Sequence, residues 1–247
     1  QALTIDAKCG KVHFNLSLAL LLSGDLERGF AEYEWRWEAD QAKKLQWLHF
    51  EQPIWDGSDL HGKTILLRSE QGFGDAIQFV RYAPIVQQKG GKVVVSCYQE
   101  LKRLFKAIPG IEQVVVRVEE LPEFHLQAPL MSLPYILGTN LDNIPANIPY
   151  LSPPAGWNFS LDSNQSLKIG IVWAGSSEHL KDFMRSTDLS YFLKFLDIPG
   201  VSFYSLQKDL SPGDRTLLNK IPVTDLSDHL NDFADTAAVI SQLDLVI

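Results

Sequence analysis

The chain has 247 residues, of which 45% are hydrophobic and 21% charged, so it has core enough for one large or two small globular domains. Its formal net charge of -8 argues against a broad phosphate-binding surface, and we expect no nucleic-acid partner. Cys9 and Cys97 are too few for a disulfide framework or a metal site, and no apolar run is long enough to cross a membrane, so we expect a cytoplasmic protein with no membrane span.

A helical hairpin is predicted for residues 1–40, because apolar residues recur at helical spacing on both sides of the break Ser23-Gly24-Asp25. The segment NLSLALLLSGDLERGFAEYEWRWE resembles one tetratricopeptide repeat. A single hairpin cannot bury its own apolar face, so either further repeats precede Gln1 or the hairpin packs on the next domain. Two helices that cap an α/β domain are the alternative.

Residues 41–62 are predicted to form an irregular, aromatic connector. Residues 57–64, GSDLHGKT, match the phosphate-loop pattern G-x-x-x-x-G-K-[ST] letter for letter. That loop works only between a buried strand and a helix, because the helix N-terminus and backbone N–H groups must face the phosphates. Pro53 argues against a strand before the pattern, and a strand is expected after it. We therefore expect Lys63 to lead into a strand.

Residues 63–155 are predicted to form a first Rossmann-like domain with a parallel, doubly wound sheet. Strands are expected at 65–67, 93–95, 114–116 and 124–127, and helices at 75–86 and 101–108. His125 is expected to be a strand or core side chain, since no partner residue has metal-ligand spacing with it. Ligands of such domains bind at the carboxyl edge of the sheet, where the turn QGFGD at 71–75 is expected.

Asp75 is the candidate catalytic residue of this turn. The turn does not complete a dinucleotide fingerprint, because Ile77 stands where the third glycine belongs, and this disfavours a Rossmann oxidoreductase. A diphosphate would also compete with Asp75 for the positive helix end. Asp75 is either a helix cap or a general base, with Gly72 and Gly74 leaving backbone space for an acceptor hydroxyl.

Residues 156–166 are predicted to be a linker, and residues 167–247 a second, incomplete Rossmann-like domain. Strands are expected at 168–174, 201–206 and 243–247, and helices at 189–196 and from Asp232 or Asp235. Small and cationic residues that follow these strands suit a diphosphate, because they allow backbone approach and supply donors. A solvated basic loop with serine caps is the alternative. The candidate donors are Ser176, Ser177, Lys181, Arg185 and Lys208.

The order of these parts resembles the glycosyltransferases of GT-B architecture. It is most similar to bacterial tetratricopeptide-repeat proteins whose catalytic region resembles ADP-heptose:lipopolysaccharide heptosyltransferases, and more distantly to O-linked N-acetylglucosamine transferases. The motifs that carry the resemblance are EYEWRWE, SEQGFGDAIQFVRYAP, IGIVWAGS, SLQKD and DFADTAAVISQLDLVI. The resemblance implies two Rossmann-like parallel-sheet domains behind a tetratricopeptide-like hairpin.

The resemblance also implies roles for particular residues. Asp75 would be the base for the acceptor hydroxyl, in the acceptor-side turn with Gly72 and Gly74. A nucleotide sugar would be a co-substrate rather than a cofactor, and the acceptor would be a glycan or a protein. The implied nucleotide-sugar-binding residues are Ser176, Lys181, Arg185, Gln207 and Lys208. In the family the last strand leads into an Asp-Thr and an Ala-His-Leu segment that grips the nucleotide, so we expect residues 1–247 alone to have an incomplete donor site.

Two functional hypotheses follow. The first is a metal-independent, inverting glycosyltransferase, because no Asp-x-Asp pair occurs that could hold a cation on a diphosphate. The second is a non-catalytic interaction module, in which the tetratricopeptide-like hairpin binds a protein partner and the remaining domains form a scaffold.

Overall fold

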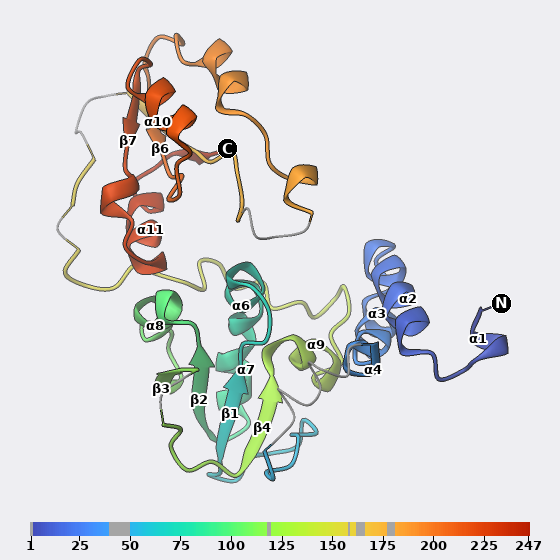
Figure 1. Ribbon diagram of the computed structural model, residues 1–247. Coiled ribbons are helices and arrows are strands. Elements are labelled where there is room, and N and C mark those ends of the chain that lie inside the picture. Colours follow the sequence, from blue (N-terminus) through green and yellow to red (C-terminus); the bar gives the residue numbers. More distant parts are fainter. Residues whose placement is uncertain (1, 40–49, 118–119, 158, 162–165, 177–180) are drawn as a thin grey trace. The chain divides into compact units, whose positions relative to one another are not determined.

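The computed structural model describes residues 2–39, 50–117, 120–157, 159–161, 166–176 and 181–247. Its elements form two compact units, residues 1–151 and 152–247, and each contains one four-stranded parallel sheet (Figure 1). The predicted α/β class with two parallel sheets is therefore confirmed. Within the described residues, no helix has both the length and the apolar character that a membrane span requires.

The first sheet has the strand order β3-β2-β1-β4. Its strands are β1 (Thr64–Arg68), β2 (Lys92–Cys97), β3 (Ile111–Val116) and β4 (Leu126–Pro129), all parallel to their neighbours. β4 begins two residues later than the strand predicted at 124–127. The chain moves outward from β1 to β3 and then returns to the other side of β1, so the strand order reverses between β1 and β4. Ligands of open parallel sheets bind outside the carboxyl ends of the strands at such a switch point.

The helix predicted at 75–86 is interrupted. α6 (Phe73–Phe79) passes through a short 3-10 segment, η1 (Val80–Tyr82), into α7 (Ala83–Gln88). Pro84 explains the interruption, because it has no N–H to donate to the carbonyl of Val80. α8 (Gln99–Phe105), η2 (Leu130–Ser132) and α9 (Leu133–Ile136) complete the helices of the sheet domain.

The N-terminal segment forms α1 (Ala2–Ile5), α2 (Gly10–Leu22), α3 (Leu26–Tyr33) and α4 (Arg36–Ala39). The predicted break between α2 and α3 is present: Gly24 has a φ of 87°, and the carboxylate of Asp25 accepts the N–H of Arg28 at 3.3 Å. α3 contacts α9, so the hairpin packs on the sheet domain. This is one of the two arrangements expected from the sequence; the likeness to a tetratricopeptide repeat stays a prediction.

The segment that matches the phosphate-loop pattern has no helix after it. Lys63 directly precedes β1, as predicted. The N–H groups of Leu60 and Gly62 donate to the carbonyls of Lys89 and Gly90, each at 2.7 Å. These N–H groups therefore fasten the loop to the end of α7 rather than facing a ligand. Residues 41–49 of the predicted connector lie outside the described residues.

The second sheet has the strand order β7-β6-β5-β8 and is also parallel throughout. Its strands are β5 (Leu167–Ile171), β6 (Val201–Ser205), β7 (Val223–Asp225) and β8 (Leu245–Val246). Among the described residues of this unit, two α-helices accompany them, α10 (Pro212–Leu218) and α11 (Phe233–Ile240). The predicted start of α11 is confirmed, because the carboxylate of Asp232 accepts the N–H groups of Ala234 and Asp235 at 2.9 and 3.1 Å.

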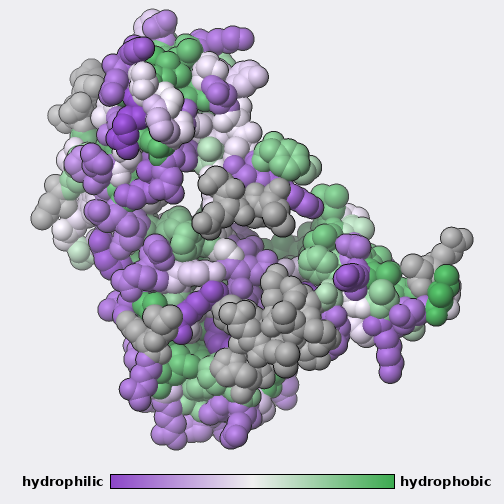
Figure 2. Space-filling model, viewed as in Figure 1, coloured by the Kyte–Doolittle hydropathy of each residue, from purple (hydrophilic) through white to green (hydrophobic). Residues whose placement is uncertain are grey.

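The remaining helical segments of the second unit are of the 3-10 type: η3 (Asp182–Met184), η4 (Leu189–Phe195) and η5 (Ser227–His229). The helix predicted at 189–196 is therefore present, as the 3-10 helix η4. Leu189 of η4 and Leu196, which follows it, belong to the apolar cluster on the second sheet, and the partly buried Phe192 packs against that cluster. On the face drawn in Figure 2, hydrophilic residues cover most of the surface, and apolar residues form separate groups.

Candidate functional site

Asp75 lies in the first turn of α6, which follows β1 after residues 69–72, at the switch point of the first sheet. Gly72 is the N-cap of α6, and its N–H donates to the carboxylate of Asp75 at 3.1 Å. Asp75 is therefore not the N-cap that the sequence suggested: Gly72 holds that position, and Asp75, three residues later, caps the helix by accepting the Gly72 N–H. Asp75 as a whole is half-buried. A second role as a proton acceptor is compatible with this geometry.

Gly74 lies inside α6 and is exposed. A Cβ atom at this position would meet no atom within 4 Å, and the φ of Gly74 is not in the left-handed region. Neither packing nor backbone conformation therefore requires glycine, although glycine inside a helix costs about 0.5–1 kcal/mol relative to alanine. Because Gly74 has no side chain, the space next to its Cα, one residue before Asp75, is open.

A buried ion pair that the sequence did not predict lies at the same edge of the sheet. The guanidinium of Arg36 donates to both carboxylate oxygens of Glu70, at 2.9 and 3.2 Å from Nη2, and the two side chains are only 6% and 3% exposed. Arg36 also donates to Glu34 at 2.6 Å and to the hydroxyl of Ser132 at 2.7 Å. Arg36 therefore links the hairpin to the turn after β1 and to η2.

Burial and charge oppose each other in this cluster. Burial alone would lower the pKa of Arg36, but the carboxylates of Glu70 and Glu34 outweigh it and raise the pKa, so the guanidinium stays charged. Nearby, burial lowers the pKa of Arg68 to about 10, with the positive charge of Arg117 adding to the shift and Glu70 opposing it. The carboxyl edge of the first sheet is thus rich in buried charge.

The main chain between β1 and α6 is held from a second side. The hydroxyl of Tyr98 donates to the carbonyl of Gln71 at 2.8 Å, and the guanidinium of Arg117 donates to the carbonyl of Ser69. Arg117 stacks on the ring of Tyr98, with its Cζ 3.8 Å from the ring centroid. The segment 69–72, which leads into the Asp75 turn, therefore has fixed partners on its carbonyl groups.

The candidate donor residues of the second unit follow β5 and β6, the two central strands of its sheet. Gly175 lies after β5, and its N–H donates to the hydroxyl of Ser186 at 3.0 Å. The Nε of Arg185 donates to the carboxylate of Asp182 at 3.1 Å, and both side chains stand over Gly175, where a Cβ would lie 2.7 Å from each. Ser176 and Lys181 are exposed nearby in the sequence, and Ser177 lies outside the described residues.

Gln207 and Lys208 follow β6. The amide of Gln207 is buried and bonded to the loop after β5, with the N–H of Ala174 donating to its Oε1 at 3.0 Å. The ammonium of Lys208 donates to the carbonyl of Ser227, after β7, at 3.2 Å. The structure thus brings Gln207 together with the Gly175 loop and ties Lys208 to the next strand end. The buried Gln207 holds the loop after β5 in place, while the exposed Lys181, Arg185 and Lys208 supply the positive charge at this edge of the sheet.

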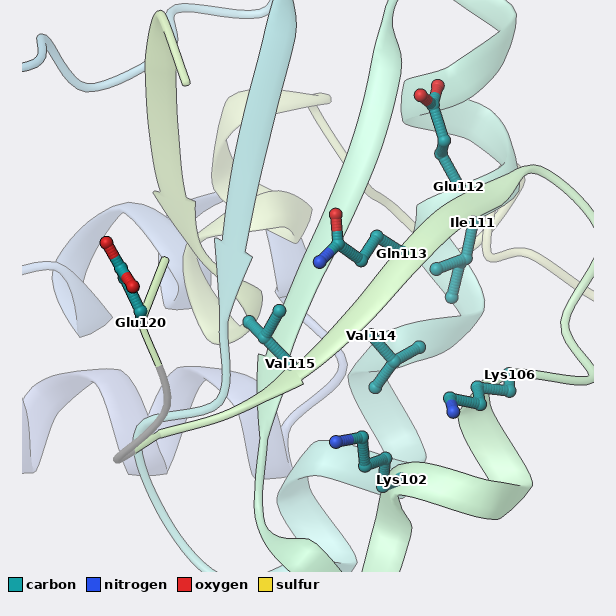
Figure 3. A pocket seen from close by; sticks show the side chains of 8 residues that line it. All are labelled: Lys102, Lys106, Ile111, Glu112, Gln113, Val114, Val115 and Glu120. Carbon is teal, nitrogen blue, oxygen red and sulfur yellow. The ribbon is translucent and has the colours of Figure 1, made fainter. Parts of the chain in front are cut away.

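The pocket in Figure 3 is a separate feature, with a volume of about 510 Å³. It lies at the open edge of the first sheet, where Lys102 of α8 and Lys106, which follows α8, stand beside β3. Glu112 at its rim pairs with Lys92 at 3.4 Å, and both side chains are more than half exposed. None of the candidate site residues lines it. Among the described residues, no three His, Cys, Asp or Glu side chains come together in a way that could hold a metal ion.

Comparisons with known proteins give two distant similarities. No family model matches the chain. Protein FlbA of Caulobacter vibrioides is 23% identical over 273 residues, an alignment that covers 96% of this chain and 44% of that protein. The solved structure of TibC, a bacterial iron-containing dodecameric glycosyltransferase from enterotoxigenic E. coli H10407, is 15% identical, with a TM-score of 0.45 over 61% of this chain and 43% of TibC. The chain therefore spans less than half the length of either protein, and neither similarity assigns it to a family.

Proposed function

We propose that the chain is part of a glycosyltransferase that moves a sugar from a nucleotide-sugar donor to an acceptor hydroxyl, with inversion and without a metal ion. The observation that carries the proposal is topological. The Asp75 turn follows β1 and the Gly175 loop follows β5, and each of these strands lies where the strand order of its sheet reverses. Both loops therefore occupy the position at which parallel sheets bind ligands.

In the proposed reaction, Asp75 takes the proton of the acceptor hydroxyl. The acceptor oxygen then forms a bond to the anomeric carbon of the sugar, and the bond between that carbon and the diphosphate oxygen breaks. Attack from the face opposite the diphosphate inverts the configuration. The electron pair leaves with the nucleoside diphosphate, whose negative charge Lys181, Arg185 and Lys208 would stabilise. A glycan or a protein is the acceptor in this proposal.

Asp75 suits the role of base in two respects. It is held by the Gly72 N–H at one oxygen and is only half-buried, so an incoming hydroxyl can reach the carboxylate. Exposed Gly74 leaves room on the same turn.

The test uses the full-length protein. Calorimetry with ADP, CDP, GDP and UDP and with their sugar adducts identifies the donor, and release of the diphosphate in the presence of glycan or protein fractions measures transfer. Asp75→Asn should lower turnover on the order of 100-fold or more, as loss of a general base does. Asp59→Asn, an exposed carboxylate in the same unit, is the matched control and should retain full activity.

The second candidate function is a non-catalytic interaction module. It is favoured by the exposed apolar side chains of α2, where Leu18 and Leu22 are 48% and 90% exposed and could contact a protein partner. This function predicts that no nucleotide binds. Nucleotide binding together with a loss of turnover in Asp75→Asn would exclude it as the main function.

A further inference from the structure

The hairpin reaches the turn before Asp75 through two side chains. Besides the contact of Arg36 with Glu70, the hydroxyl of Tyr33 accepts the side-chain amide of Gln71 at 2.9 Å. Glu70 and Gln71 are consecutive residues between β1 and α6. The junction between α3 and α4, with Tyr33 on one side and Arg36 on the other, thus contacts both residues of a segment that is neither strand nor helix.

The segment is held both by the hairpin and by the residue that precedes α8. Arg36 grips the side chain of Glu70, and the hydroxyl of Tyr98, from the start of α8, donates to the carbonyl of Gln71. The next residue, Gly72, makes the hydrogen bond that orients the Asp75 carboxylate. Because each link is one residue from the next, a shift of residues 70–71 moves the atom that holds Asp75. A carboxylate that must meet a hydroxyl at hydrogen-bond distance tolerates little displacement.

We propose that Arg36 and Tyr33 are positioning residues, through which the hairpin sets the place of Asp75. This proposal rests on the proposed function. It makes the hairpin a structural part of the acceptor side rather than a separate protein-binding module. A buried ion pair adds little net stability, because the desolvation of both charges offsets their attraction, and well-packed apolar residues often stabilise a protein equally well. The guanidinium of Arg36 contacts both carboxylate oxygens of Glu70 and so fixes the orientation of that side chain, which apolar packing would not do.

Two hairpin variants test the proposal without removing the packing. Tyr33→Phe deletes only the hydroxyl that Gln71 contacts, and Arg36→Lys keeps the positive charge but cannot form the two-pronged contact with Glu70. Tyr82→Phe is the matched control, because the Tyr82 hydroxyl is also buried and bonded, to Thr139 at 3.1 Å, but does not touch the turn. All variants are made in the full-length protein.

The first readout is amide hydrogen exchange over residues 69–75. Exchange there should become faster on the order of tenfold in Tyr33→Phe and Arg36→Lys, while β1 and β2 keep their protection and Tyr82→Phe behaves as wild type. Wild-type exchange in both hairpin variants would overturn the proposal. Equal loosening throughout residues 1–151 would overturn it too, since that is the effect of a purely structural contact.

The second readout is release of nucleoside diphosphate from the nucleotide sugar that the protein binds. In both hairpin variants kcat should fall by about tenfold while KM for the donor stays unchanged, because the donor residues belong to the other unit. A rise in donor KM with unchanged kcat would contradict positioning. Failure of the proposed function itself appears separately, as an Asp75→Asn variant with wild-type turnover, whatever the exchange experiment shows.

Discussion

The side-chain amide of Gln207 pairs with both main-chain groups of Ala174. Its Oε1 accepts the N–H of Ala174 at 3.0 Å, and its Nε2 donates to the carbonyl of the same residue at 3.1 Å. This is the pairing that a peptide group on a neighbouring strand would make, and it continues the contact between β5 and β6 beyond their last paired residues. The loop after β5 therefore begins from a fixed point.

Replacing this amide with a carboxylate should destabilise the protein. In Gln207→Glu the side chain can still accept from Ala174, but it cannot donate to the Ala174 carbonyl and faces it with a negative charge. We expect a loss of about 1–3 kcal/mol in the free energy of unfolding, measured with urea at neutral pH. Gln88→Glu makes the same chemical change at an exposed position of α7 and should stay within about 0.5 kcal/mol of wild type. Equal stability of the two variants would contradict the pairing described.

The sheets were predictable from the sequence because buried parallel strands appear as continuous apolar runs. Val93, Val94 and Val95 are an example: all three are buried in β2, where the sequence predicted a strand. Asp232 likewise marked the start of α11, since an N-cap residue interacts with amides two and three positions ahead. These features are determined by neighbours in the sequence.

The buried polar contacts of the site were not predictable in the same way. Arg36 and Glu70 are 34 positions apart and are of residue types that usually face water. Gln207 was predicted to bind the nucleotide sugar, and its bonds to Ala174, 33 positions earlier, could not be inferred from spacing. The one available signal was the run EYEWRWE, in which charges alternate with large aromatic residues and Trp37 proves buried.

Gly74→Ala separates a functional glycine from a structural one. Since a Cβ at Gly74 meets no atom within 4 Å and the residue lies in α6, we expect the variant to be more stable, by up to about 1 kcal/mol. If acceptors approach Asp75 across this glycine, turnover should nevertheless fall. Thermal unfolding and a turnover assay on the same sample measure both effects. Unchanged turnover in the stabilised variant would remove Gly74 from the acceptor site.

Gly91→Ala is the contrasting case. A Cβ at Gly91 would lie 2.4 Å from the Cδ1 of Leu60 and 2.9 Å from the carbonyl oxygen of Lys63. Leu60 is fully buried, so the added methyl group has nowhere to go without shifting the start of β1. We expect a loss of about 1–3 kcal/mol in the free energy of unfolding, the cost of overpacking a core. A Gly91→Ala variant as stable as Gly74→Ala would show that this close approach is wrong.

His13 should make the stability of the first unit depend on pH. The carbonyl of Ala7 raises the pKa of His13 most, burial opposes this, and Glu32 and Asp6 raise it further. A histidine whose pKa is higher in the folded than in the unfolded state stabilises fully below its unfolded value of about 6.5, and this contribution is lost as the pH rises through the folded pKa. The melting temperature should therefore fall from pH 6 upward by more in wild type than in His13→Gln. An equal slope in wild type and His13→Gln would contradict this contribution of His13.

The ion pair between Arg36 and Glu70 should show strong coupling in a double-mutant cycle. Arg36→Met leaves the Glu70 carboxylate, 3% exposed, without its cation, and we expect a loss of about 3–5 kcal/mol in the free energy of unfolding. Adding Glu70→Met removes the stranded charge, so the double variant should recover much of that loss. Arg28→Met, which breaks an ion pair on the same hairpin in which the arginine side chain is 70% exposed, should cost less than about 1 kcal/mol. Additive losses from Arg36→Met and Glu70→Met would mean that the two side chains do not interact in solution, and with that result the hairpin would lose its strongest hold on the turn before Asp75.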